Sequence, residues 1–378
     1  MDMGCLVAGT GLAGGVRLAR SDAAASHAMI DYLEGHLGLS HHLWHELPAP
    51  AASSGHVLTQ EAREALMPHY STLNLRACLD PAGGDLDRVL EREVAVALLG
   101  SPVAFEFDDV DEFASHVRVQ RRICRAAAQT AVAFKTLAAE RPERYWTYDD
   151  DAGFLLRPGE RLSDALRAAT QPSITGQLYD FSCYRASEYV ILLGLSEELE
   201  CVNHSMLENL EQRCRRRAIR SREFHDVFLD EFGSNEQPLP ARYFVPGDRL
   251  WFRNPDERSS DALGYEGSWV IYLGGGLFSN FWKHDRPYTL EEKCIEIFHW
   301  RDGAYQDEQH EWQMDETRVD AQVARTQADP AERSRVLERM MRLRDPQGVY
   351  AQGGCLDASR EQPKSVWPGH CRLRMQLS

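Results

Sequence analysis

The amino-acid sequence predicts an α+β fold, because the spacing of its apolar residues changes from helical to strand-like along the chain. Three observations support this class. Apolar residues recur at helical spacing through much of the first half, strand-like runs separated by turn residues fill positions 243 to 284, and the composition is that of a globular protein. With 378 residues, of which 43% are hydrophobic and 26% charged, the chain can bury a sizeable core.

The first half contains mostly helical signals. Apolar residues at helical spacing predict a long amphipathic helix over Asp108–Leu137, with an aspartate pair at its N-cap. Tyr145–Tyr148 and Phe154–Leu156 flank an Asp-rich, Gly-containing turn and read as a hairpin. A short helix over Ser163–Ala169 follows, and Glu188–Leu199 continues an apolar helix that begins close to a cysteine.

The second half contains a series of strands, which Pro-Gly-Asp and Asn-Pro-Asp turns separate. The predicted strands are Tyr243–Phe244, Leu250–Phe252, Ser268–Leu273 and, after a turn of three glycines, the return strand Leu277–His284. Leu290–Trp300 returns to helical spacing, and the polar tail beyond Gln306 contains one further helix, Pro330–Leu343.

Charge and cysteine content exclude several classes of protein. A net charge of −16 argues against nucleic acid as the main ligand, and no apolar run approaches the roughly 20 residues of a membrane helix. Nine irregularly spaced cysteines without a Cys-x-x-Cys pair fit neither a disulfide framework nor a structural zinc site. Met1–Gly15 lacks the basic leader of a signal peptide, so we expect a cytoplasmic protein.

The candidate nucleophile is Cys183, which opens the apolar helix of the first half. Free N–H groups and the positive end of the helix dipole lower the pKa of a thiol at this position and stabilise its thiolate. The same N–H groups can hold the oxyanion that forms when a thiolate attacks an amide carbonyl. A buried structural cysteine is the alternative interpretation, and composition alone favours it.

The glycine hairpin supplies candidate partners for this cysteine. If the loop is centred on Gly275, Glu266 lies opposite His284, and if it is centred on Gly276, Ser268 does. Both candidates belong to one face of the strand, because residues two apart point the same way. A carboxylate beside His284 would fix the tautomer of the imidazole and support it as a base.

Several of these segments also resemble a known family, the spore-coat protein-glutamine gamma-glutamyltransferases. Phe181–Leu195 is similar to the nucleophile segment of that family. Tyr243–Asp248 followed by Leu250–Asp256 resembles its most recognisable stretch, and the Gly267–Gly274 pattern follows at the right interval. Pro102–Phe107 and Tyr145-Trp146 match upstream, so the likeness runs in order from about position 102 to position 301.

The resemblance implies a site and a fold. The family nucleophile falls on Cys183, and the family histidine falls on His284 if the preceding loop holds three extra residues; without them Phe281 would occupy that place. The family glutamate falls on Ser268, a departure for which Glu266 is the alternative third member. The implied fold is a papain-like α+β core with a helix-borne cysteine packed on an antiparallel sheet. This catalytic domain would span residues 101–305, with extensions at 1–100 and 306–378.

The activity implied is cysteine-dependent acyl transfer, in which Cys183 forms a thioester with a glutamine side chain and a lysine amine resolves it. Partners would be proteins with exposed glutamine and lysine, and no cofactor, metal, calcium, nucleic acid or membrane is implied. Two alternatives stay open. One is a cysteine hydrolase (a glutamine deamidase or peptidase), with delivery by a specialised secretion system as a toxin. The other is a non-catalytic binding protein on a decayed transglutaminase scaffold. The oligomeric state is left open.

Overall fold

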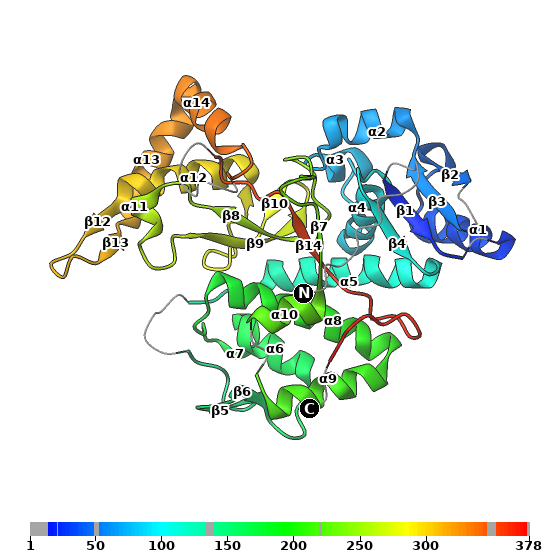
Figure 1. Ribbon diagram of the computed structural model, residues 1–378, viewed down its shortest axis with the longest axis horizontal. Helices are drawn as coiled ribbons and strands as arrows, with labels where there is room; N and C mark the ends of the chain where they lie inside the picture. Colours follow the sequence, from blue (N-terminus) through cyan, green and yellow to red (C-terminus); the bar gives the residue numbers. More distant parts are fainter. Residues whose placement is uncertain are drawn as a thin grey trace.

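The structure is a computed structural model that describes residues 14–20, 22–48, 53–133, 139–218, 221–345 and 353–375. Its helices are α1 (Ala23–Ile30), α2 (Gln60–Leu66), α3 (Leu75–Leu79), α4 (Leu86–Leu99), α5 (Val110–Gln129), α6 (Leu162–Thr170), α7 (Pro172–Thr175), α8 (Cys183–Val202), α9 (His204–Arg216), α10 (Ser221–Phe228), α11 (Glu257–Ser260), α12 (Leu290–Gly303), α13 (Glu316–Ala328) and α14 (Pro330–Met340). Helices and sheets are interleaved around two long helices, α5 and α8, so the predicted α+β class is confirmed (Figure 1).

Two larger sheets carry most of the strands. The first has the order β2-β3-β1-β4, and the second has the order β11-β10-β9-β8-β14-β7. The strands are β1 (Gly15–Leu18), β2 (Trp44–Pro48), β3 (Ser54–Leu58), β4 (Ala104–Phe107), β5 (Trp146–Asp149), β6 (Gly153–Leu156), β7 (Leu229–Phe232), β8 (Arg249–Arg253), β9 (Gly267–Gly274), β10 (Leu277–Phe278), β11 (Tyr288–Thr289), β12 (Ala304–Gln306), β13 (Trp312–Met314) and β14 (Arg360–Pro363). The predicted hairpin after position 145 is present as β5 and β6.

The central six-stranded sheet is antiparallel throughout and provides the surface on which the candidate nucleophile helix packs. Strands β8 and β9 pair from Arg249–Ile271 to Arg253–Gly267, as the sequence predicted for neighbouring antiparallel strands. Strand β14, from near the end of the chain, lies between β7 and β8. The segment after residue 306 therefore contributes one strand to the central sheet.

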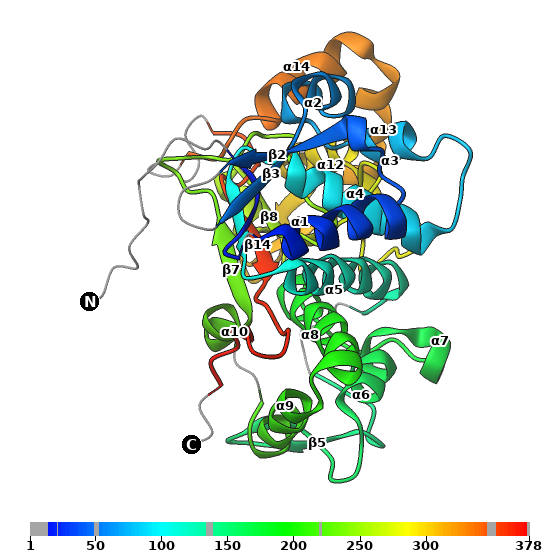
Figure 2. The same ribbon diagram turned by 90° about the vertical axis from the view of Figure 1, so that its right-hand side faces the viewer.

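The first sheet contains strands from both sides of the boundary that the sequence suggested at residue 100. Its strand β4 lies beyond residue 100 and pairs in parallel with β1, near the start of the described chain. Helix α4 packs between this sheet and α5, and Figure 2 shows α5 running below it and above α8. The first sheet therefore combines strands from both sides of position 100.

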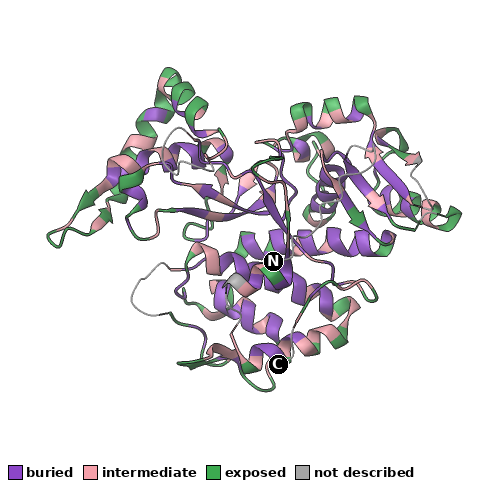
Figure 3. Cartoon of the chain, viewed as in Figure 1, coloured by how far each residue is buried: buried purple, intermediate pink, exposed green. Residues whose placement is uncertain are grey.

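Helices α5 and α8 form the buried centre of the molecule. Helix α5 ends at Gln129, earlier than the predicted Leu137, and residues 134–138 lie outside the described part of the chain. The faces that α5, α8 and the central sheet turn toward one another are buried, as the purple segments of Figure 3 show. The predicted apolar face of α8 is confirmed, since Val190, Ile191 and Leu195 are at most 1% exposed. Helix α8 also packs on β9, so the predicted helix-borne cysteine on an antiparallel sheet is present.

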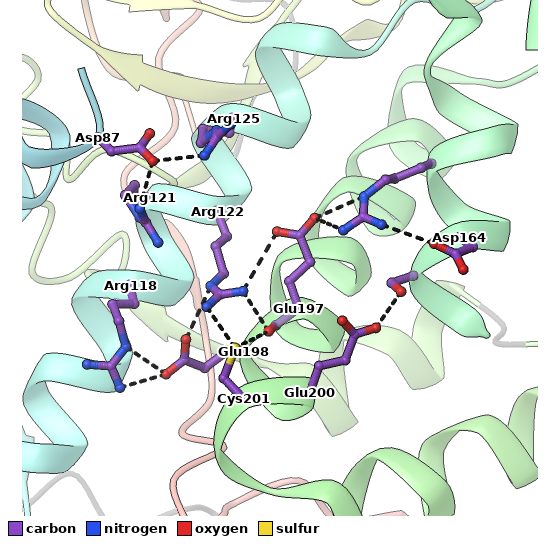
Figure 4. Close-up of polar contacts among 12 residues, drawn as sticks. Asp87, Arg118, Arg121, Arg122, Arg125, Asp164, Glu197, Glu198, Glu200 and Cys201 are labelled. Carbon is purple, nitrogen blue, oxygen red and sulfur yellow. Dashed lines mark hydrogen bonds and ion pairs between the residues drawn. The ribbon is translucent and has the colours of Figure 1, made fainter. Parts of the chain in front are cut away.

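A polar network joins α5 and α8 at the end of α8 that lies away from Cys183 (Figure 4). The Glu198 side chain is completely buried and accepts hydrogen bonds from the Ser115 hydroxyl at 2.9 Å and from Arg118 Nη2 at 2.8 Å. The Nε of Arg122 lies 3.2 Å from its second carboxylate oxygen. A buried carboxylate requires such partners, because its desolvation is otherwise too costly. The network therefore fixes how α8 lies along α5.

Within the described residues, no helix is both long and apolar enough to cross a membrane.

Helix α8 packs tightly against α5 at Gly194, so we expect a larger side chain there to destabilise the protein. A Cβ atom at Gly194 would lie 2.6 Å from Ile123 Cγ1 and 3.0 Å from the Ile123 backbone nitrogen. We expect Gly194→Ala to lower the free energy of unfolding by about 1–3 kcal/mol in denaturant titrations, because overpacking outweighs the helix-propensity gain of alanine.

The matched control is Gly35→Ala. Position 35 is helical, and nothing lies within 4 Å of an added Cβ there. This variant should be neutral or stabilised by up to about 1 kcal/mol. Equal stability of the Gly194 variant and the wild type would contradict the close packing of α5 on α8.

Candidate active site

Cys183 is the first residue of α8, as the sequence predicted. Ser182 precedes it in an extended conformation, and its hydroxyl accepts a hydrogen bond from the Arg185 backbone N–H at 3.2 Å. This serine is the N-cap, and its hydroxyl satisfies one of the N–H groups that a helix leaves without an intrahelical partner in its first turn. The thiol is partly buried between this turn and the edge of β9.

The surroundings of the thiol act on its pKa in opposite directions. Burial raises the pKa of Cys183 above its usual value and is the largest effect. Hydrogen bonds from the Trp269 and Tyr184 N–H groups lower this pKa, and so does the Lys293 ammonium, whereas the Glu266 carboxylate raises it. The bond from Trp269 N–H to the sulfur measures 3.5 Å. Because burial prevails, the resting cysteine is mainly a thiol at neutral pH.

A cavity of about 390 Å³ lies between the start of β9 and α12, and we call it the α12 cavity. Ser268, the residue before Trp269, lines it from β9, while Lys293 and Glu296 line it from α12. Asn280 and Lys283, from the connection between β10 and β11, also line it. The Cys183 sulfur accepts a hydrogen bond from the Trp269 N–H, and Ser268, the residue before Trp269, lines the cavity.

His284 lies in an exposed turn and not in a strand. The predicted return strand to His284 is wrong beyond Phe278, because β10 is only two residues long and β11 then pairs with it on the other side. The chain reverses in between, and the Arg286 N–H donates to the Lys283 carbonyl at 2.8 Å around His284. The predicted pairing of His284 with Glu266 or Ser268 across the hairpin is therefore absent.

The two candidates for the third position differ in their surroundings. Ser268 is 4% exposed, lies opposite Phe252 in the ladder and lines the α12 cavity. Glu266 is exposed just before β9, and its carboxylate acts on the thiol by charge. In the part of the chain that the structure describes, no hydrogen bond or ion pair joins His284 to Cys183, Glu266 or Ser268.

Sequence reasoning missed two residues of the cavity wall, Asn280 and Lys293. Asn280 braces the His284 turn, because its Nδ2 donates to the Arg286 carbonyl at 3.1 Å and its Oδ1 accepts from the Lys283 N–H at 3.2 Å. No sequence signal marks this asparagine, since it falls inside the expected return strand. Lys293 lies among charged residues of α12, where a lysine normally faces solvent.

One group of side chains has the residue types of a metal site. Ligand atoms of Asp108, Glu112 and His370 lie within 4.8 Å of one another. Glu112, however, accepts the Asp108 N–H at 2.6 Å, and His370 is paired with Asp108 and Asp109. These contacts cap α5 and hold the C-terminal segment against it, so the group is explained without an ion.

The chain is similar to known proteins. A family model described as protein-glutamine gamma-glutamyltransferase matches residues 84–364, more than half of the chain. A protein-glutamine gamma-glutamyltransferase of Halalkalibacterium halodurans is 26% identical over 203 residues, which cover 51% of this chain and 64% of that protein. The chain therefore spans less than two thirds of this relative.

A solved structure of a transglutaminase from Geobacillus stearothermophilus, without its C-terminal extension, is 20% identical to this chain. The match covers 57% of this chain and 97% of that structure, with a TM-score of 0.41. The extent of the family match is decisive, and the chain belongs to the protein-glutamine gamma-glutamyltransferase family.

Proposed function

We propose that the protein is a protein-glutamine gamma-glutamyltransferase that works through a Cys183 thioester. The observation that carries the proposal is the position of Cys183 on the first turn of α8, where it hydrogen-bonds to β9 beside the α12 cavity. Membership of the family supports the same activity. Substrates would be proteins with exposed glutamine and lysine side chains.

In the proposed reaction the Cys183 sulfur attacks the carboxamide carbon of a glutamine, and a C–S bond forms. The developing oxyanion accepts hydrogen bonds from N–H groups of the first turn of α8. The C–N bond then breaks, ammonia leaves with an added proton, and a thioester remains. A lysine amine attacks the thioester, its proton is removed, and the thiol is released from the isopeptide product.

His284 is the proposed base and acid, and Glu266 the proposed group that orients it, with Ser268 as the alternative. The His284 turn borders the α12 cavity through Lys283 and is exposed, so the histidine would meet the sulfur only when substrate binding closes the turn. Catalytic hydrogen bonds are often long or unformed in an empty site.

The second candidate function is a non-catalytic binding protein on the same scaffold. Two observations favour it: burial raises the pKa of the Cys183 thiol, and neutral side chains, Ser268 and Asn280, line the cavity beside it. Such a protein would bind glutamine-containing partners without turnover.

The first test uses a protein substrate with a labelled primary amine. We expect covalent amine incorporation with release of ammonia, and complete loss of both in Cys183→Ala, because no other group replaces the sulfur. Cys201→Ala is the matched control, since Cys201 is an exposed thiol at the far end of α8, and it should keep wild-type activity.

The other outcomes separate the alternatives. Ammonia release without incorporation would identify a deamidase, and peptide cleavage a peptidase. If neither product forms while substrate proteins still bind, the chain is the non-catalytic binding protein.

The second test measures the pH dependence of Cys183 alkylation by iodoacetamide in a variant that retains Cys183 as its only reactive thiol. Since burial raises the pKa, the rate should continue to rise past the pH at which an ordinary cysteine levels off. Glu266→Gln removes a carboxylate that raises the pKa, so alkylation near neutral pH should accelerate. Ser268→Ala removes no charge and should leave the profile unchanged.

The same variants assign the third catalytic position. If Glu266 orients His284, Glu266→Gln must slow amine transfer while it accelerates alkylation. Unchanged transfer in Glu266→Gln together with a loss in Ser268→Ala would assign the role to the serine. Full amine-transfer activity in His284→Gln would show that the histidine has no role in the reaction.

A further inference from the structure

A second cavity, of about 340 Å³, lies beside the β5–β6 hairpin, and we call it the hairpin cavity. Its walls come from this hairpin and from helices α6, α8, α9 and α10. It shares no lining residue with the α12 cavity, and the proposed reaction makes no use of it. Cavities that bind small molecules measure about 300–1,000 Å³, so the hairpin cavity is large enough for a small ligand.

A buried guanidinium lines the hairpin cavity. Arg141 is only 8% exposed, and its Cζ lies 3.5 Å from the centre of the Phe181 ring. The rings of Phe154 and Tyr189 have their centres 4.9 Å and 5.0 Å from the same atom. All three aromatic side chains also line the cavity. Aromatic faces attract a cation and hold it in place, but they do not neutralise its charge.

The hydrogen bonds of Arg141 are made to neutral acceptors. Its Nε donates to the Tyr189 hydroxyl at 3.2 Å, and its Nη1 donates to the carbonyl oxygens of Asp180 at 2.8 Å and Glu140 at 2.5 Å. Among the described residues, no carboxylate forms an ion pair with this guanidinium, and Nη2 has no hydrogen-bond acceptor. Asp180, which also lines the cavity, has a partner besides Arg141. Since a buried cation normally lies beside an anion, a ligand carboxylate would supply the counter-charge.

The other charged side chains that α8 and α9 contribute to this wall form ion pairs. On α8, the Arg185 Nη1 lies 2.7 Å from the buried Glu188 carboxylate. At the end of α9, the Arg217 Nη2 lies 3.0 Å from the Glu223 carboxylate. An incoming anion would therefore have to compete with a carboxylate at either of these arginines, but not at Arg141.

We propose that the hairpin cavity binds a carboxylate ligand with an apolar body, and that the ligand carboxylate pairs with Arg141. The Arg141 guanidinium is planar and is held by three rings, so little side-chain freedom is lost when it binds a carboxylate. Trp146, Leu162 and Leu166 line the same cavity and would contact the apolar body. Two sources share this chemistry: a free organic acid and the C-terminal residue of a protein. Binding requires no reaction at Cys183, so the inference goes beyond the proposed function.

The first measurement is a calorimetric titration of the full chain with 3-phenylpropionate. We expect saturable binding, and binding at least about tenfold weaker for 3-phenylpropionamide, because the amide keeps the shape of the acid but has no charge to pair with the guanidinium. Equal binding of the acid and the amide, or tighter binding of 3-phenylpropylamine, would overturn the proposal.

The second measurement assigns the binding to Arg141. Arg141→Met should weaken the binding of 3-phenylpropionate on the order of tenfold and leave that of the amide unchanged, because only the acid uses the charge. Arg144→Met is the matched control, since Arg144 is exposed on the same segment and does not line the cavity. Wild-type affinity for the acid in folded Arg141→Met would contradict the assignment.

A photoreactive ligand locates the site even if Arg141→Met does not fold. A benzoate that carries a diazirine should label residues 146–156 or 181–192 of the wild-type chain after irradiation, because these segments line the hairpin cavity. Excess 3-phenylpropionate should suppress the labelling. Labelling confined to other segments, or labelling that the acid does not suppress, would refute the site.

Two peptides distinguish the sources of the carboxylate. A tetrapeptide that ends in phenylalanine with a free C-terminus should bind if the ligand is a protein C-terminus, whereas its C-terminal amide should not. Binding of 3-phenylpropionate without binding of the peptide would identify a free organic acid. If neither acid binds while the wild type transfers amines, this inference alone fails. If 3-phenylpropionate binds but no amine is transferred, the proposed function alone fails.

Discussion

The close packing of α8 on α5 is the constraint on which the rest of the structure depends. Gly194 allows the two helices to approach until the Ile123 side chain occupies the space of a missing Cβ. Farther along the same interface, the buried Glu198 carboxylate is held by Arg118 and Arg122 (Figure 4). Apolar contact alone would leave α8 free to slide along α5. A buried carboxylate, however, is stable only where its charged and hydrogen-bonding partners surround it. The network around Glu198 therefore determines the register of α8 along α5.

The register of α8 places the candidate active site. With the charged end of the helix fixed on α5, its first turn meets the edge of β9, and the Cys183 sulfur receives the Trp269 N–H. Strand β9 is held in turn by β8, and β8 by β14 from near the end of the chain. Helix α12 then supplies the remaining wall of the cavity. The site is therefore assembled from segments about a hundred residues apart, and each depends on the central sheet.

The chemistry of the site is a balance between burial and charge. Burial excludes water from the sulfur and raises the pKa of the thiol, whereas the Lys293 ammonium and two backbone N–H groups favour the thiolate. A protein that exposed the thiol would ionise it more readily, because the thiolate would then be hydrated. His284 lies in an exposed turn, because the chain reverses after Phe278 and the hairpin does not bring the histidine to the sulfur.

The α+β class, the strands β8 and β9 and the helix that begins at Cys183 were determined by the sequence alone, because periodicity, turn residues and N-caps act over a few neighbouring residues. The likeness of the stretch around Leu250–Asp256 was also sufficient to indicate the family. Tertiary structure alone decided that β14 enters the central sheet, that the chain turns back after Phe278 and that Lys293 is buried beside the site. Local pattern gives no sign of these features, because each depends on a partner that is distant in sequence. A lysine in a charged stretch of helix becomes buried only when a carboxylate and two aromatic rings are folded around it.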